Sequence, residues 1–386
     1  MRAGELQSPR LAAQRSAVTA ASQQVGRAGE LPDPKLRLGI ENLPVTGADR
    51  FRYDRDFMTM RNVGVMQEFP NSAKREARNL RAERARDVET AGLEAQRAML
   101  ARDIAMAWLD VHYAERSRTA LERLVRQFQL QVDTLAAGVA RGRQSTADAF
   151  MARSALEQAN DRIIEQERMI AKARIMLAAL IGDDANRPLA AGPDTTRFAH
   201  SRDHLVARLS EHPELRMYEQ REGLARAEAD VARSTARSDW ALEVGYGYRR
   251  PAFDNMLTVM VSIDLPWQKE QRQDRDIASK LAEVDQARAL RENARRMHEA
   301  EVRGWLADFD TAEKRIERFE RTLLPLARER SSAALAAYQG GRGELGSVLE
   351  AERAVSETEL GLTQALAERG KAWANLNYLY PQGASR

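Results

Sequence analysis

The chain has 386 residues, with 60 lysines and arginines against 57 aspartates and glutamates, and it contains no cysteine. The balanced charge gives no case for nucleic-acid binding, and the missing cysteines exclude thiolate enzymes, disulfide scaffolds and cysteine metal sites. Only 6% of the residues are aromatic and 30% are charged, which is typical of long solvated helices rather than of a compact enzyme. No run of about 18 apolar residues is present, so the sequence predicts no transmembrane helix.

The N-terminal segment begins MRAGELQSPR and has no apolar stretch of the kind found in a signal peptide. An exported protein needs such a stretch. If the chain is exported, we therefore expect the start to be trimmed or misplaced. A helical pattern follows from about residue 8 to 30, and a strand is expected at 36–44. A second strand, expected at 63–70, ends in proline and leads into a long helical stretch at 73–139.

This long helix carries a heptad rhythm that predicts a supercoiled seam against a neighbouring helix. The seam residues alternate four and three apart: Leu121, Val125, Phe128, Val132, Leu135 and Val139. Gly142 and Arg143 then predict a reversal of the chain. The return helix keeps a seven-residue spacing through Leu156, Ile163, Ile170 and Leu177.

The second half of the chain repeats the order of the first, after a proline-containing linker at 182–202. It predicts a helix from His212, two strands within 240–266, and a long helix at 268–338 interrupted by Pro325. A seam is expected along it at Ile316, Phe319, Leu323 and Leu326, followed by a turn at Gly341 and Arg342. We therefore predict two repeats, 1–195 and 196–386, with strand pairs at about 35–70 and 240–266 and hairpin tips near 142 and 342. The predicted fold class is mainly α with a small β part.

Each strand segment alternates between apolar and polar residues, as membrane-barrel strands do. The side chains predicted to face lipid are Leu36, Leu38, Ile40, Leu242, Val244, Tyr246, Leu257, Val259, Val261 and Ile263. Those predicted to line a wet lumen are Lys35, Arg37, Glu41, Glu243 and Arg249. The second strand is less regular, because Arg61 falls in the register of Val63 and Val65. Alternation alone leaves open a small soluble sheet that caps a helical protein.

Four strands cannot close a barrel by themselves. An open sheet edge in lipid leaves backbone groups unpaired, at several kcal/mol each. Two copies would give a barrel filled with side chains, whereas three would give a wider and hollow one. If the strands lie in a membrane, closure thus favours a rotationally symmetric oligomer, most simply a trimer.

Several motifs, in order and duplicated, resemble the TolC family of outer-membrane efflux ducts, and most closely its heavy-metal branch of cobalt-zinc-cadmium and copper-silver resistance. They are Gly39-Ile40-Glu41-Asn42-Leu43-Pro44, Gln67-Glu68-Phe69-Pro70, Ile263-Asp264-Leu265-Pro266, the first tip from Gly142 to Arg153 and the second from Tyr338 to Ala351. The resemblance covers nearly the whole chain. It implies a homotrimeric duct in which each copy gives four strands to a shared barrel in the outer membrane. The long helices would form a coiled-coil tube in the periplasm.

The same resemblance implies partners at the helix tips. These would be a periplasmic adaptor, also called a membrane fusion protein, and an inner-membrane efflux pump of the resistance-nodulation-division type. The tip residues that would contact the adaptor are Gly142, Arg143, Asp148, Gly341, Arg342 and Glu344. The chain departs from the family in having Gly346 and Ser347 near the second tip. The family's tip aspartates therefore cannot be placed there, and Glu344 or Glu350 is the substitute.

No constellation in the sequence supports catalysis, a cofactor or a metal site. The five histidines are scattered, and His200 and His204, although spaced as metal ligands on a helix can be, have no obvious third ligand nearby. We expect structural or surface roles for them. The leading hypothesis is a passive conduit, not an enzyme, for solutes that are heavy-metal cations if the branch resemblance holds. The alternative is a soluble coiled-coil scaffold or adaptor protein with no channel.

Overall fold

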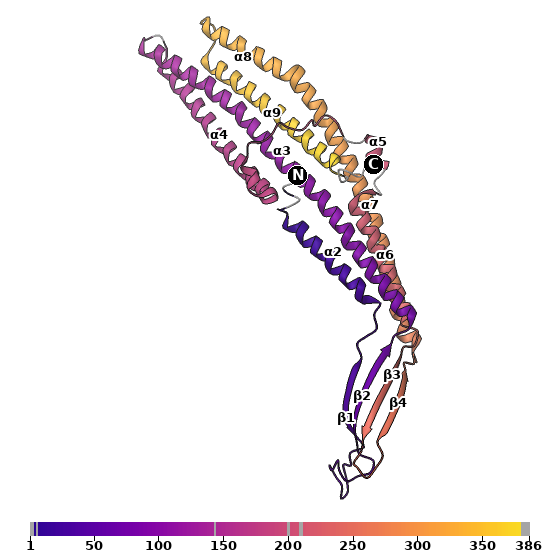
Figure 1. The fold of residues 1–386 in the computed structure, drawn as a ribbon. Helices are drawn as coiled ribbons and strands as arrows, with labels where there is room; N and C mark the ends of the chain where they lie inside the picture. Colours follow the sequence, from indigo (N-terminus) through magenta and orange to yellow (C-terminus); the bar gives the residue numbers. More distant parts are fainter. Residues whose placement is uncertain (1–3, 5–6, 143, 199–200, 208–210, 380–386) are drawn as a thin grey trace. The chain divides into compact units, whose positions relative to one another are not determined.

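The computed structural model describes residue 4 and residues 7–142, 144–198, 201–207 and 211–379. The chain divides into two compact units, and each unit takes segments from both halves of the sequence. One unit, called here the helical unit, comprises residues 1–13, 94–215 and 295–386. The other, called the strand unit, comprises residues 14–93 and 216–294. Figure 1 shows the elements of both.

The strand unit contains a four-stranded antiparallel sheet with the order β1-β2-β3-β4 (Figure 1). Its strands are β1 (Lys35–Glu41), β2 (Met60–Phe69), β3 (Trp240–Tyr248) and β4 (Met256–Ile263). The pairing of β2 with β3 joins the two halves of the chain, and Phe69 lies directly opposite Trp240. All four strands lie where the alternation of the sequence predicted them, to within a few residues.

A helix precedes each strand pair, and a much longer helix follows it. The preceding helices are α2 (Pro9–Ala28) and α6 (Pro213–Ser234). Each begins at a proline, whose fixed φ suits the first turn and whose missing N–H would have no partner there. The following helices are α3 (Ser72–Ala140) and α7 (Gln273–Arg318), the latter preceded by a 3-10 turn at Lys269–Gln271.

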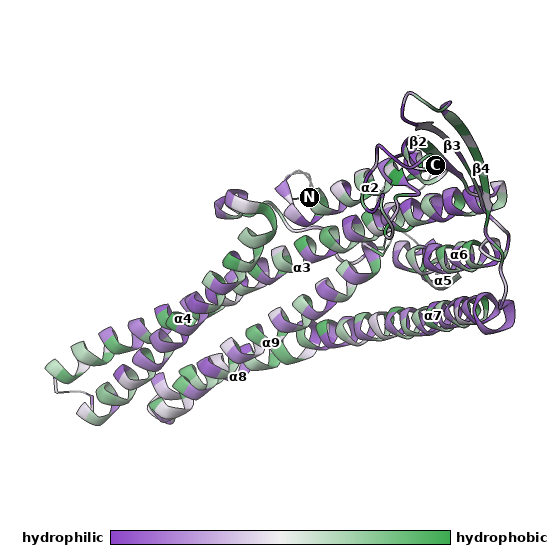
Figure 2. Ribbon diagram, turned by 90° about the horizontal axis from the view of Figure 1, so that it is seen from below, coloured by the Kyte–Doolittle hydropathy of each residue, from purple (hydrophilic) through white to green (hydrophobic). Residues whose placement is uncertain are grey.

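The helical unit is built from two long hairpins, in which α3 returns as α4 (Thr146–Ile181) and α8 (Leu324–Gln339) returns as α9 (Leu345–Asn377). A 3-10 helix at Gly182–Asn186 and the short α5 (Arg202–Ala207) lie between the repeats. Along α3, α4, α8 and α9, hydrophilic and hydrophobic residues alternate, as expected of helices with one packed stripe (Figure 2). None of the described helices combines the length and apolar character that crossing a membrane requires.

The first predicted seam is present. Leu121, Phe128 and Leu135 are 4%, 1% and 1% exposed, and Leu156 and Leu177 on the return helix are also buried. A cluster near the hairpin ends brings α3, α4 and α9 together. Its buried members are Leu124, Phe128, Leu135, Ala152, Ala155, Leu156, Ala159, Leu345 and Leu349. The heptad spacing thus identified a real packing interface.

The second predicted seam is wrong beyond Phe319, because Leu323 and Leu326 are 36% and 56% exposed. A π-helical segment, Phe319–Leu323, lies between α7 and α8. One wider turn rotates every following side chain about the helix axis, so the neighbouring Leu324 packs on the buried cluster instead. Pro325 accompanies this distortion, since proline cannot donate the hydrogen bond of a regular helix interior.

Candidate functional site

Two rows of apolar side chains cross the whole sheet on one face. The register places Leu36, Val65, Val244 and Val259 side by side in one row, and Leu38, Val63, Tyr246 and Leu257 in the next. These side chains are exposed in the single chain, Leu38 by 73% and Leu257 by 71%. Every residue of the two rows except those of β2 was predicted to face lipid.

Aromatic residues flank this apolar face at both ends of the strands. At one end, the rings of Phe69 and Trp240 stack at 4.2 Å between centroids, with 14° between their planes. At the other end, Arg61 lies opposite Ile40 and Tyr248, which explains the irregularity of the second strand. The Arg61 guanidinium lies over the ring of Tyr53, 4.6 Å from its centroid.

The opposite face of the sheet is charged and closely packed. Arg37 forms an ion pair with Glu243 at 2.8 Å, and Lys35 pairs with Glu68. Gly64 lies opposite Gly245, where a Cβ at Gly64 would come within 3.3 Å of the Gly245 backbone. Glu41, which was also predicted to line the lumen, is the last residue of β1 and lies opposite Met60.

Arg249 lies one residue beyond β3, in the connection to β4. Its guanidinium donates to the backbone carbonyl of Phe57 and lies 5.2 Å from the centre of the Phe253 ring. These contacts hold two loops together at the end of the sheet. Arg249 therefore lies beyond the paired strands, whereas Lys35, Arg37 and Glu243 lie within them.

Each hairpin tip contains one glycine with a positive φ. Gly142 and Gly341 adopt φ values of 65° and 70°, which glycine reaches at no steric cost. An added Cβ would meet nothing within 4 Å at either position, so both turns face open space. Arg342 is exposed, and Glu344 forms the N-cap of α9. Arg143 lies outside the described residues.

The two tips contact each other through Tyr338 at the end of α8. Its hydroxyl donates to the side-chain carbonyl of Gln144 at 3.2 Å. Burial raises the pKa of Tyr338, and the nearby Asp148 carboxylate raises it further, against the opposing effect of the bond to Gln144. The hydroxyl is therefore protonated at neutral pH. On the first tip, Ser145 caps α4 and Asp148 lies in its first turn, where a negative charge is favourable.

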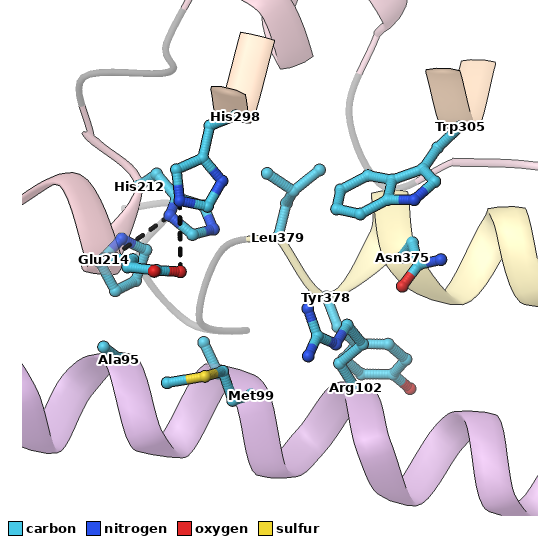
Figure 3. A pocket seen from close by; sticks show the side chains of 12 residues that line it. Ala95, Met99, Arg102, His212, Glu214, His298, Trp305, Asn375, Tyr378 and Leu379 are labelled. Carbon is cyan, nitrogen blue, oxygen red and sulfur yellow. Dashed lines mark hydrogen bonds and ion pairs between the residues drawn. The ribbon is translucent and has the colours of Figure 1, made fainter. Parts of the chain in front are cut away.

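A second cluster, which the sequence did not reveal, brings together His212, Glu214 and His298 in the helical unit (Figure 3). The histidines are scattered along the sequence, and residues 212 and 298 are far apart in it. Of the predicted i, i+4 pair, His200 lies outside the described residues. No spacing rule could have found this cluster, since it depends on how α7 lies against the start of α6.

Three comparisons with known proteins bear on these observations. A profile of the family described as "Outer membrane efflux protein" matches residues 5–183 and 205–380. The chain belongs to this family. The paired match agrees with the duplicated order of elements. No curated protein sequence matches the chain.

Solved structures share the fold at low sequence identity. A membrane protein from Pseudomonas aeruginosa is 19% identical, covers 98% of this chain and 91% of its own length, and gives a TM-score of 0.83. The outer membrane protein VceC from Vibrio cholerae is 18% identical, with coverages of 98% and 94% and a TM-score of 0.81. CusC is 16% identical, with coverages of 98% and 90% and a TM-score of 0.78.

Family membership settles the broad class of the protein. It is an efflux channel of the outer membrane, with the TolC-like duct fold that the motifs implied. Members of the family are transport conduits, which confirms the expectation that the chain is not an enzyme. The soluble scaffold without a channel, our alternative, does not fit this assignment.

Proposed function

We propose that three copies of this chain assemble into one conduit, with the apolar sheet face turned toward lipid and the charged face toward a water-filled lumen. The two apolar rows that run across all four strands carry the proposal. Contact between these apolar rows and water costs free energy, and surrounding the rows with lipid removes that cost. The aromatic residues at both strand ends occupy positions where membrane barrels carry aromatic girdles.

The edges of the sheet support closure by further copies. Among the described residues, β1 and β4 each pair with one strand only. Their outer backbone groups need partners in lipid, and the β4 edge of one copy can supply them to the β1 edge of the next. Three copies give a barrel wide enough to remain hollow, whereas two would fill it with side chains.

The exposed tips are the proposed docking surface for a periplasmic adaptor, which links the duct to an inner-membrane pump of the resistance-nodulation-division type. The surface comprises Gly142, Arg143, Asp148, Gly341, Arg342 and Glu344. The open turns at Gly142 and Gly341 support this role, since a Cβ added at either glycine would meet none of the described atoms within 4 Å. The proposed solutes are heavy-metal cations, on the strength of the motif resemblance described above.

Matched arginine substitutions test the orientation of the sheet. Val259→Arg places a charge in the middle of the apolar face, and Thr258→Arg places one on the opposite face beside Gly245. A charged side chain facing the bilayer midplane costs about 2–4 kcal/mol. With a signal sequence attached, Val259→Arg should reduce the amount of trimer in the outer-membrane fraction, and Thr258→Arg should leave it near the parent level. Equal yields of the two variants would contradict the proposed orientation.

Complementation tests the solute. A host that lacks its own ducts would receive this chain together with its neighbouring pump and adaptor genes. We expect increased tolerance of Zn²⁺, Co²⁺, Cd²⁺ or Cu⁺ and no change in tolerance of organic dyes. The opposite pattern would reject the heavy-metal assignment while leaving the duct itself intact.

A further inference from the structure

We propose that His212, Glu214 and His298 form a binding site for a divalent transition-metal ion such as Zn²⁺. One ligand atom from each residue lies within 4.8 Å of the other two. Imidazole nitrogen and carboxylate oxygen are the ligands that such ions take in proteins. Three protein ligands leave one position of a tetrahedral ion open. The site would hold a resident ion of the duct wall, distinct from the transported solutes.

The distance between two of the ligands already fits an ion. His298 Nε2 lies 3.2 Å from Glu214 Oε2. Two ligands on a tetrahedral zinc, each at about 2.0–2.1 Å from the metal, are separated by roughly 3.3 Å. A metal can therefore replace the shared proton of this pair without moving either backbone. Figure 3 shows Glu214 reaching up from the first turn of α6 toward the His298 ring on α7.

Glu301 supplies the outer support that metal-binding histidines use. Its Oε2 lies 3.3 Å from His298 Nδ1, which has no aligned hydrogen-bond partner and is buried. A histidine that binds a metal through Nε2 carries its proton on Nδ1 and usually donates it to a carboxylate or carbonyl. A small rotation of the Glu301 side chain would provide that acceptor and fix the His298 ring for metal binding.

His212 completes the set from the residue before Pro213. Its ring lies 4.5 Å from that of His298, centroid to centroid. Burial and the neighbouring His298 charge lower the pKa of His212 to about 4, so its imidazole is neutral, which is the form that binds metals. Its Nδ1 accepts a long bond of 3.3 Å from the Glu214 backbone N–H. Metal binding through Nε2 places the ring proton on Nδ1. Nδ1 can then no longer accept from the Glu214 N–H, so this weak contact is lost.

The charges around the site favour the binding of a cation. The carboxylates of Glu214 and Glu301 contribute two negative charges. Arg102 lines the same cavity and opposes them, but it is ion-paired with Asp103 at 3.2 Å. The cavity itself has a volume of about 30 Å³ and is also lined by Trp305, Asn375 and Tyr378. This volume accommodates a water molecule in the fourth position of the ion.

Cobalt titration tests the proposal on the full chain, purified in detergent and stripped of metal with a chelator. Tetrahedral Co²⁺ gives visible absorption bands that zinc binding abolishes. We expect one Co²⁺ per protomer, displaced by one equivalent of Zn²⁺ and unaffected by Mg²⁺ or Ca²⁺. His298→Gln should remove the bands. Glu301→Gln keeps all three ligands and should weaken binding by about 10–100-fold.

His112→Gln is the matched control. His112 is half-buried in the same unit and stacks on Trp108, outside the cluster. Its loss should leave cobalt binding unchanged. Circular dichroism and particle mass would first establish that each variant is folded and assembled. Unchanged cobalt binding in folded His298→Gln, or absence of binding in the parent, would overturn the site. Outer-membrane assembly is a separate readout, so the duct proposal stands or falls independently.

Discussion

Phe69 and Trp240 face each other at the point where the two halves of the chain meet in the sheet, and their rings stack at 4.2 Å. Phe69 is the last residue of β2 and Trp240 the first of β3. Each belongs to a different repeat, so this pair joins the repeats by side chains as well as by the backbone ladder. It also lies on the apolar face, at the end nearest the helices α3 and α6.

A double-mutant cycle on Phe69→Ala and Trp240→Ala should reveal this contact directly. Offset aromatic pairs contribute about 0.5–1.5 kcal/mol beyond the area they bury. We expect a coupling free energy of that size, measured from thermal unfolding in detergent. Gln67 and Leu242, also directly opposite each other on these strands, are the control pair and should couple less. Equal coupling in both pairs would mean that the stacking adds nothing specific.

Asp239 connects the start of β3 to the start of α3. It accepts hydrogen bonds from the backbone and side-chain N–H groups of Asn71, at 2.9 and 3.0 Å, and pairs with the Lys74 ammonium. Burial favours the protonated acid, but these donors outweigh it and lower the pKa of Asp239. Asn71 also accepts from the Lys74 backbone N–H at 2.8 Å, so it caps α3 as well.

Replacing Asp239 by Asn should therefore destabilise the strand unit by about 1–3 kcal/mol at neutral pH. Because the folded pKa is lowered, the charged carboxylate stabilises the fold above the ordinary aspartate pKa of about 3.9. That contribution is lost as the pH falls through the lower folded pKa. The difference between parent and variant in unfolding free energy should shrink accordingly in acid. Asp264→Asn, at an exposed aspartate after β4, is the control and should change the unfolding free energy little at neutral pH.

Gly341 tests the backbone requirement at the second tip. Its φ of 70° is unfavourable for residues with a Cβ, and an alanine there should cost about 1–2 kcal/mol. Within the described part of the chain no atom lies within 4 Å of the added Cβ, so the cost is conformational. Asn tolerates this conformation, so Gly341→Asn should cost less. Gly304→Ala, in open space within α7, should instead stabilise the chain by about 0.5–1 kcal/mol. The same sign for both alanine variants would refute this explanation.

Much of the fold could be predicted because its signals are local and repeated. The third and fourth strands both lie within the predicted span 240–266, and the heptads along α3 identified buried positions. The π-helical segment could not be predicted, because Ile316, Phe319, Leu323 and Leu326 satisfy a regular heptad. The Phe319 ring packs against Gly361 of α9, a contact that no spacing in α7 reveals.

The candidate sites likewise differ in whether the sequence alone could predict them. Strand alternation placed Leu38 and Val259 on one face and Arg37 on the other, since a two-residue period needs no tertiary information. The histidine cluster depends on the packing of α6, α7 and the neighbouring cavity, and nothing near His212 in the sequence points to His298. The link between Tyr338 and Gln144 was equally hidden, because each belongs to a different hairpin.

The proposed adaptor surface at the tips leads to the last prediction. Arg342 is exposed beside the open turn at Gly341, and Arg143 follows the equivalent turn at Gly142. Replacing both arginines by glutamate reverses the charge presented to the adaptor, which should slow docking and weaken it. We expect reduced metal tolerance in complemented cells, with trimer assembly in the outer membrane unchanged.

A control variant separates docking from a general effect of surface charge. Arg321→Glu reverses the charge of an exposed arginine in the π-helical segment, which is not part of the tips. Arg321 pairs with Glu317 at 2.9 Å. Because an exposed ion pair contributes at most about 1 kcal/mol, this change should leave tolerance and assembly intact. Cross-linking between duct and adaptor would measure docking itself. Full cross-linking by the tip double variant, or equal loss of it in Arg321→Glu, would rule out the tips as the specific docking surface.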